Sequence, residues 1–257
     1  MMGLDGARVR AVARKDLQDF RRKRTIVLSM SLIPLTYLIV AMVLITVLSV
    51  TKNGSGPIPT VPLLYLLLNP VMMPAIVASY SVVGEREQGT LEPLLSTPLR
   101  QQELILGKAA AVMLPTIVLS YAVYALFLAF VALFAKSASA SAVFHDGPAL
   151  VSLVIFTPLL AGWSIAVGMA ASVRANEARV AQQVATLSSF PAIAIVVFMM
   201  IGLIHPHFLV ALEFAVGLAL LDALILRLTI QMFNRERLIV GTVPTRKPGG
   251  GMMSSNP

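Results

Sequence analysis

The chain has 257 residues, of which 57% are hydrophobic and 12% charged, with a formal net charge of +8 and no cysteine. Soluble domains carry about 25% charged residues, so this composition excludes an ordinary soluble protein. The lack of cysteine excludes disulfides and thiolate sites. The positive charges lie beside apolar segments, which favours anionic lipid headgroups rather than nucleic acid as their partner.

Six apolar segments are long enough to cross a bilayer, which takes about 20 helical residues. Backbone exposed to lipid has to form its hydrogen bonds within its own segment, so we expect each segment to be a helix. The sequence therefore predicts an all-α membrane protein with a transmembrane domain over residues 25–235. The six predicted spans are residues 25–50, 61–83, 108–135, 150–172, 181–204 and 208–232.

The basic residues indicate how the spans are oriented. Of the 20 Lys and Arg residues, all but Lys52 and Lys136 lie before span one, between spans two and three, between spans four and five, or toward the C-terminus. Because basic loops stay on the cytoplasmic side, both termini are predicted to be cytoplasmic. The Ala- and Val-rich composition favours the cell membrane of a prokaryote.

The two terminal regions differ from the spans. Residues 1–24 form a basic arm in which four apolar residues recur at helical spacing: Val9, Ala13, Leu17 and Phe20. This pattern predicts an amphipathic helix in the headgroup plane that also contacts a cytoplasmic partner; the alternative is a plain orientation signal. Residues 236–257 are rich in Pro, Gly and Ser and are predicted to be disordered.

A charged excursion, GEREQGTLEPLLSTPLR, follows the second span. Gly89 can end a helix and Thr90 can cap the next one, which Pro98 would then terminate. Three leucines in between, Leu91, Leu94 and Leu95, form an apolar ridge with too little chain around it for burial. The segment is thus predicted to be a short helix across the membrane surface that docks a partner, or a hairpin that folds back on its own spans or the bilayer.

The longer stretch GEREQGTLEPLLSTPLRQQELILGK resembles the coupling segment of ABC-2 type transporter permeases. That family shows a Glu-rich exit from span two, Gly-Thr-Leu-Glu, a Leu pair, Thr-Pro, and Gly-Lys at the start of span three. The loop NEARVAQQ is similar to the sodium- and drug-export branch. The resemblance covers residues 5–235.

The resemblance implies a dimer of permease subunits, each seated on an ATP-binding subunit, in an exporter. The coupling segment would be residues 84–107, with a docking helix and its exit carried over by position to Thr90, Leu91, Glu92, Leu94, Leu95, Thr97 and Pro98. A charged belt at the membrane edge would comprise Glu85, Arg86 and Glu87. A second contact would involve Arg174, Glu177 and Arg179.

Any ATP and Mg²⁺ are expected in the partner subunit. The chain has no G-x-x-x-x-G-K-[ST] loop to hold phosphates, since LGKAAA lacks both the upstream glycine and the Ser or Thr. We therefore expect no cofactor and no catalytic residue in this chain.

Several residues inside the spans call for an explanation. Asp222 lies near the middle of span six, where it either lines a pathway or forms a structural hydrogen bond, with Asn69 or Ser164 as partner. Pro70 and Pro74 are expected to kink span two, because proline removes helical hydrogen bonds. The outer-loop histidines are His145, His205 and His207. His205 and His207 lie two residues apart without a third ligand nearby, so no metal site is expected.

Two other classes of function compete with the transporter. An intramembrane hydrolase could use Glu85 and Glu87 with histidines, but the predicted topology places these groups on opposite sides of the bilayer. An ATP-independent channel or carrier could depend on Asp222 alone, but would leave the leucine ridge unexplained. Copurification with an ATPase separates these alternatives.

Overall fold

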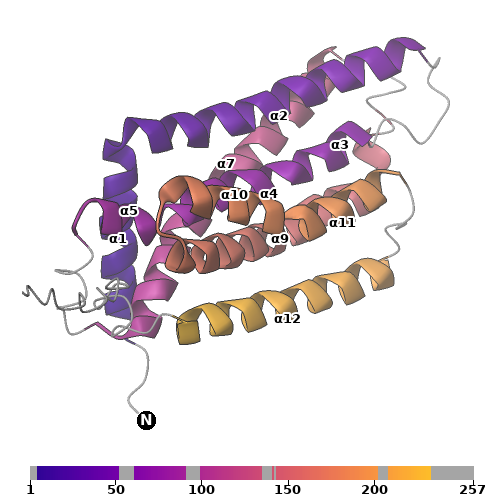
Figure 1. Ribbon diagram of the computed structural model, residues 1–257. Helices are drawn as coiled ribbons and strands as arrows, with labels where there is room; N and C mark the ends of the chain where they lie inside the picture. The colour runs from indigo at the N-terminus through magenta and orange to yellow at the C-terminus, as the bar shows by residue number, and fades with distance from the viewer. Residues whose placement is uncertain are drawn as a thin grey trace, which may run out of the picture.

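The computed structural model describes residues 5–51, 61–90, 99–134, 141, 143–201 and 208–232. All regular structure within these ranges is helical, which agrees with the predicted class (Figure 1). The elements are α1 (Gly6–Arg22), α2 (Arg24–Thr51), α3 (Val61–Tyr65), the 3₁₀ turn η2 (Leu66–Leu68), α4 (Asn69–Ser79), α5 (Val83–Glu87), α7 (Gln101–Phe134), α9 (Gly147–Arg174), α10 (Ala178–Ser188), α11 (Phe190–Met200) and α12 (Phe208–Met232).

Five stretches of the described chain have the length and hydropathy to cross a membrane. They are Ile26–Val47, Val61–Glu87, Gln101–Phe134, Gly147–Arg174 and Ala178–Met200, which correspond to the first five predicted spans. The predicted sixth span is helical throughout as α12, but it is not among these five. Multiple membrane crossings are therefore supported, whereas a count of six stays a prediction.

Spans two and five are interrupted helices. The second contains η2 immediately before α4, whose first turn holds Pro70, and it breaks again at a turn between α4 and α5. The fifth breaks at Ser189, just before Pro191 opens α11. Proline has no N–H to donate and crowds the preceding turn, so it favours such interruptions. The kink that the prolines predicted in span two takes the form of this 3₁₀ turn.

Helix α9 occupies the middle of the bundle, with α4 packed on one side of it and α12 on another (Figure 1). Close approach of α4 and α9 depends on Gly168, where an added Cβ would lie 2.9 Å from the Ala78 Cβ. Larger side chains, including Phe127 and Phe156, fill the core. The bundle thus combines small residues at its tightest crossing with bulky apolar residues elsewhere.

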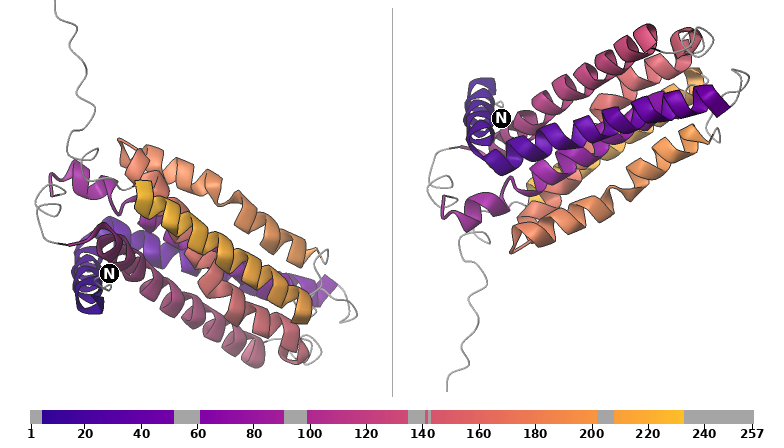
Figure 2. Two further views of the ribbon diagram at one scale, coloured as in Figure 1. Left: turned by 90° about the horizontal axis from the view of Figure 1, so that it is seen from below. Right: turned by 90° about the horizontal axis from the view of Figure 1, so that it is seen from above.

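Helix α1 lies across one end of the bundle in every view (Figures 1 and 2). We call this end the α1 end. The helix crosses the start of α7 at Gly107, where an added Cβ would be 2.6 Å from the Val12 Cβ. The predicted amphipathic helix is present, but the centre of its buried face is Val12 and Asp16, while Val9 and Ala13 are only partly buried. Asp16 is buried because it meets a cation that sequence spacing could not reveal.

Candidate functional site

The start of the predicted coupling segment is fixed by the way in which α5 ends. Gly89 has a φ of 67°, the left-handed region that glycine adopts without strain. The Thr90 N–H donates to the Glu85 carbonyl at 2.9 Å and the Gly89 N–H to the Arg86 carbonyl at 3.1 Å, which together form a Schellman motif. Gly89 therefore ends the helix as predicted, and Thr90 emerges exposed.

The predicted docking helix itself lies outside the described residues. These comprise Leu91, Glu92, Leu94, Leu95, Thr97 and Pro98, so their role stays a prediction. The described chain resumes at Leu99 and enters α7. The structure does describe α5, the helix that leads into this segment, and shows how α5 is attached to the bundle on two sides.

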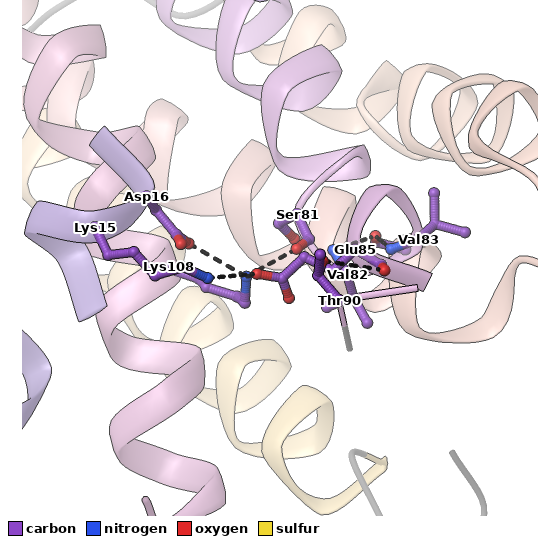
Figure 3. A network of polar contacts seen from close by, with 9 residues as sticks. Lys15, Asp16, Ser81, Val82, Val83, Glu85, Thr90 and Lys108 are labelled. Carbon is purple, nitrogen blue, oxygen red and sulfur yellow. Dashed lines mark hydrogen bonds and ion pairs between the residues drawn. The ribbon is translucent and has the colours of Figure 1, made fainter. Parts of the chain in front are cut away.

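On one side, α5 is attached through a buried lysine. The Lys108 ammonium, only 2% exposed, lies 2.8 Å from Glu85 Oε1 and 3.2 Å from Asp16 Oδ2 (Figure 3). It also donates to the Ser81 carbonyl at 2.9 Å. Lys15 reaches the same Glu85 oxygen at 3.4 Å from the rim. We call Lys15, Asp16, Glu85 and Lys108 the Lys108 cluster; it joins α1, α5 and α7.

The charges of the Lys108 cluster depend on one another. Burial raises the pKa of Asp16, an effect that the adjacent Lys108 ammonium partly opposes. One oxygen of Glu85, Oε2, is buried and has no hydrogen-bond partner in the described part of the chain. Lys108 thus bonds to both carboxylates, and Lys15 adds a longer contact to Glu85 from the rim. Removal of Lys108 would leave two acids facing each other in a poorly solvated site.

On the other side, α5 is attached to the turn between α9 and α10. Arg86 Nη1 donates to the Ala175 carbonyl at 2.9 Å, at the C-terminal end of α9. Glu87 Oε1 accepts from the Ala178 N–H at 2.9 Å, at the first residue of α10. A cation at a helix C-terminus and an anion at an N-terminus both match the helix dipole. We call these two bonds the helix-end contacts.

A serine of α9 holds the break between α4 and α5. Ser172 Oγ accepts from the Val82 and Val83 N–H groups, each at 3.0 Å. These are donors at the start of a helix, which have no partner within the helix itself. Ser172 is fully buried. The turn after α4 therefore depends on a side chain about 90 residues further along the chain.

Glu103 joins the beginnings of α1 and α7. Its Oε2 accepts from the Arg100 N–H at 3.0 Å, the reach-back bond of a capping box. Its Oε1 accepts from the Asp5 N–H at 3.2 Å, and Arg8 lies 3.7 Å from the carboxylate. The Glu103 side chain thus accepts hydrogen bonds from backbone N–H groups at the start of both α1 and α7.

The structure brings two predicted sets of residues together. The belt formed by Glu85, Arg86 and Glu87 adjoins the turn that carries the predicted second contact, and all three residues of that contact are exposed: Arg174, Glu177 and Arg179. Sequence reasoning missed Asp16 and Ser172. One signal was available for Asp16, an acid one helical turn after Val12 on an otherwise apolar face.

A cavity of about 1140 Å³ opens at the α1 end. It is bounded by α1, α2, α4, α5, α7 and α10, and the Lys108 cluster forms part of its wall. Tyr80 and Gln182 line the side toward α10, where the Tyr80 hydroxyl donates to Gln182 Oε1 at 3.4 Å. The cavity is therefore lined both by the Lys108 cluster and by Glu87, one of the residues of the helix-end contacts.

Neither predicted structural partner of Asp222 bonds to it. Asn69 Nδ2 donates to Ser120 Oγ at 3.1 Å, and Ser164 Oγ has no partner in the described chain. Asp222 instead packs against Gly162, where an added Cβ would be 2.7 Å from its Oδ2. The hydrogen-bond prediction was wrong because α12 meets α9 at a glycine, and a pathway role stays a prediction.

Comparison with known proteins identifies the family. A search of curated proteins found no match. The family model described as "ABC-2 family transporter protein" matches residues 10–228, which include the Lys108 cluster, the helix-end contacts and most of α12. The chain therefore belongs to the ABC-2 transporter family and is a multi-pass membrane component of an ABC transporter.

Proposed function

We propose that this chain is the permease subunit of an ATP-driven exporter. A separate subunit binds ATP and Mg²⁺, hydrolyses the ATP, and docks on residues 84–107. A second permease subunit, identical or paralogous, completes the pathway through the membrane. In this proposal α12 is the sixth span, and both termini lie in the cytoplasm of a prokaryotic cell.

The attachment of α5 carries the proposal. The exposed end of α5 at Thr90 leads directly into the leucine ridge, while its other residues bond to α1, α7, α9 and α10. A force applied to the ridge therefore reaches several spans through short polar contacts. A segment that merely folded back on the bilayer would have no need of such an anchorage.

The distribution of charge supports the orientation. The described basic residues of α1, α5 and the α9–α10 turn lie at the α1 end, together with the start of α7. By the positive-inside rule this end faces the cytoplasm, where an ATPase would be found. The docking surface and the ATP supply are then on the same side of the membrane.

The test replaces two of the three leucines in the ridge. In Leu94→Asp/Leu95→Asp, copurification with the proposed ATP-binding subunit should be lost while the spans stay folded. The matched control is Gln101→Glu/Gln102→Glu, which adds two negative charges close by but keeps both leucines. Normal assembly of the leucine variant would contradict docking at this segment.

A second measurement tests the topology. The chain has no cysteine, so a single Leu94→Cys change gives one site for a membrane-impermeant thiol reagent. The proposal expects labelling only after the membrane is opened. Labelling from outside intact cells would overturn it, and transport by the purified chain without nucleotide would favour an ATP-independent carrier.

A further inference from the structure

The cavity at the α1 end has both charged and apolar walls. Among the described residues, four acids and four bases line it, so the charges of its lining sum to zero. Apolar side chains come from three helices: Phe20 of α1, Ile26 of α2 and Ile76 of α4. A ligand that matches this lining carries apolar surface together with charges of both signs.

Three of the eight charged residues are left over for a ligand. The Lys108 cluster and Glu87 account for the other five, each of which already has a partner. The three are Asp19, Arg22 and Lys23, at the end of α1, and no described residue forms an ion pair with any of them. Along α1, Asp19 lies nearer the Lys108 cluster, and the two bases lie nearer α2. The unpaired negative and positive charges are therefore separated along the cavity.

The inner wall offers further hydrogen-bonding atoms. Ser81 Oγ and Glu85 Oε2 are buried and have no partner in the described part of the chain. Both residues line the cavity, and each already meets the Lys108 ammonium through another oxygen (Figure 3). A buried carboxylate oxygen without a donor is costly, so a ligand that brings N–H groups to this wall is favoured.

An apolar stripe continues from the cavity along α4. Nine of the eleven residues of α4 are buried, and the two that are not, Met72 and Ile76, lie one helical turn apart. Tyr80 follows after another turn, so the three side chains share one face. Ile76 and Tyr80 also line the cavity. An apolar stripe that leaves a polar cavity and follows a membrane span matches the acyl chain of a lipid.

We propose that this cavity binds the headgroup of a zwitterionic aminophospholipid, in which a primary ammonium follows the phosphate. The phosphate contacts Arg22 and Lys23 beside α2, the ammonium points toward Asp19 and the inner wall, and an acyl chain follows the stripe on α4. A purely anionic headgroup would leave Asp19 without a partner. Because α1 is predicted to lie in the headgroup plane, the cavity is at the depth of such headgroups. The bound lipid links α1 to span two, whether or not an ATPase is docked.

The first test compares lipids with identical acyl chains. Each lipid is added to the purified, delipidated full-length chain, and the lipids retained are counted by native mass spectrometry. One phosphatidylethanolamine should be retained at about a tenfold lower concentration than phosphatidylglycerol, which lacks the ammonium, or phosphatidylcholine, whose ammonium has no N–H. Equal retention of either of these lipids, or no retention of phosphatidylethanolamine, would overturn the proposal.

The second test locates the site with variants. Arg22→Gln/Lys23→Gln should weaken retention of phosphatidylethanolamine about tenfold, and Asp19→Asn should abolish its advantage over phosphatidylglycerol. The matched control is Arg10→Gln/Arg14→Gln, which removes two exposed positive charges of the same helix that do not line the cavity. The control should retain the lipid as the parent does. Equal losses in the two double variants would indicate general attraction to a basic helix and would overturn the site.

A competition experiment separates the lipid from its free headgroup. Soluble phosphoethanolamine carries the same phosphate and ammonium but has no acyl chain to lie along α4. An equimolar amount should therefore leave the bound phosphatidylethanolamine in place. Complete displacement would mean that the cavity takes a soluble phosphoamine, and would overturn the assignment of the stripe to an acyl chain.

Discussion

Helix α5 is attached on its two sides by different kinds of interaction. Toward α1 and α7 it relies on the Lys108 cluster, in which buried charged side chains neutralise one another. Toward α9 and α10 it relies on bonds to backbone groups at helix ends and on the Ser172 hydroxyl. The first attachment depends on charge balance, so one change affects every member. The second depends on backbone positions, so its bonds can be removed one at a time.

The largest expected effect is that of Lys108→Met. Methionine fills similar space but leaves Asp16 buried without its cation and leaves Glu85 with only the exposed Lys15, which we expect to lower the free energy of unfolding by about 3–5 kcal/mol. Unfolding in detergent micelles measures it. A decrease of less than about 1 kcal/mol in the free energy of unfolding would show that Lys108 does not neutralise the carboxylates of the cluster.

The pH dependence of Lys108→Met sharpens the same test. The pKa of Asp16 is raised in the folded protein, so the folded state binds this proton more tightly than the unfolded state, and stability falls as the pH rises from 3.8 through the folded value. Without Lys108 the pKa of Asp16 rises further. The stability difference between variant and parent should therefore shrink as the pH is lowered; a difference that grows would contradict this explanation.

Gly107→Val tests whether α1 has to touch α7 for the cluster to form. The new Cβ would overlap Val12, and we expect a loss of about 1–3 kcal/mol together with faster proteolysis of α1. The matched control is Gly217→Val in α12, where no atom of the described part of the chain lies within 4 Å of the added Cβ. Equal effects of the two substitutions would argue against a specific crossing at Gly107.

Ser172→Ala tests the attachment on the α9 side. Two buried N–H groups, those of Val82 and Val83, lose their acceptor, for which we expect a loss of about 2 kcal/mol and faster hydrogen exchange at both amides. Ser152→Ala is the control on the same helix, because among the described residues its buried hydroxyl bonds only to the Pro148 carbonyl one turn earlier. Unchanged hydrogen exchange at the Val82 and Val83 amides would show that other contacts stabilise the turn between α4 and α5.

Lys15→Gln should have the smallest effect. The Lys15 side chain is 48% exposed and shares Glu85 with Lys108, so its loss should lower stability by less than about 1 kcal/mol. Added salt should reduce the difference further, since exposed ion pairs are screened. If Lys15→Gln lowered stability as much as Lys108→Met, burial would not determine how much each lysine contributes to stability.

The end of α5 and the interior of the bundle differ in how well the sequence predicted them. Gly89 ends its helix as expected, because the left-handed conformation it adopts is a local property of glycine. The second-span prolines likewise indicated an interruption. By contrast, the pairing of Asn69 with Ser120, and the contact of Asp222 with Gly162, depend on how α4, α7, α9 and α12 are rotated. Hydropathy reports the apolar length of a span but not its rotation about its own axis.

The sequence by itself determined the helical membrane class, the first five spans, the family resemblance and the end of α5 at Gly89. These follow from apolar length and from the conformations that single residues prefer, both of which are local. Only the tertiary structure decided that Lys108 neutralises Asp16 and Glu85, and that Arg86 and Glu87 meet the ends of α9 and α10. The physical reason is that a buried charge is stable only beside a partner of opposite charge, and here each partner comes from a distant part of the chain.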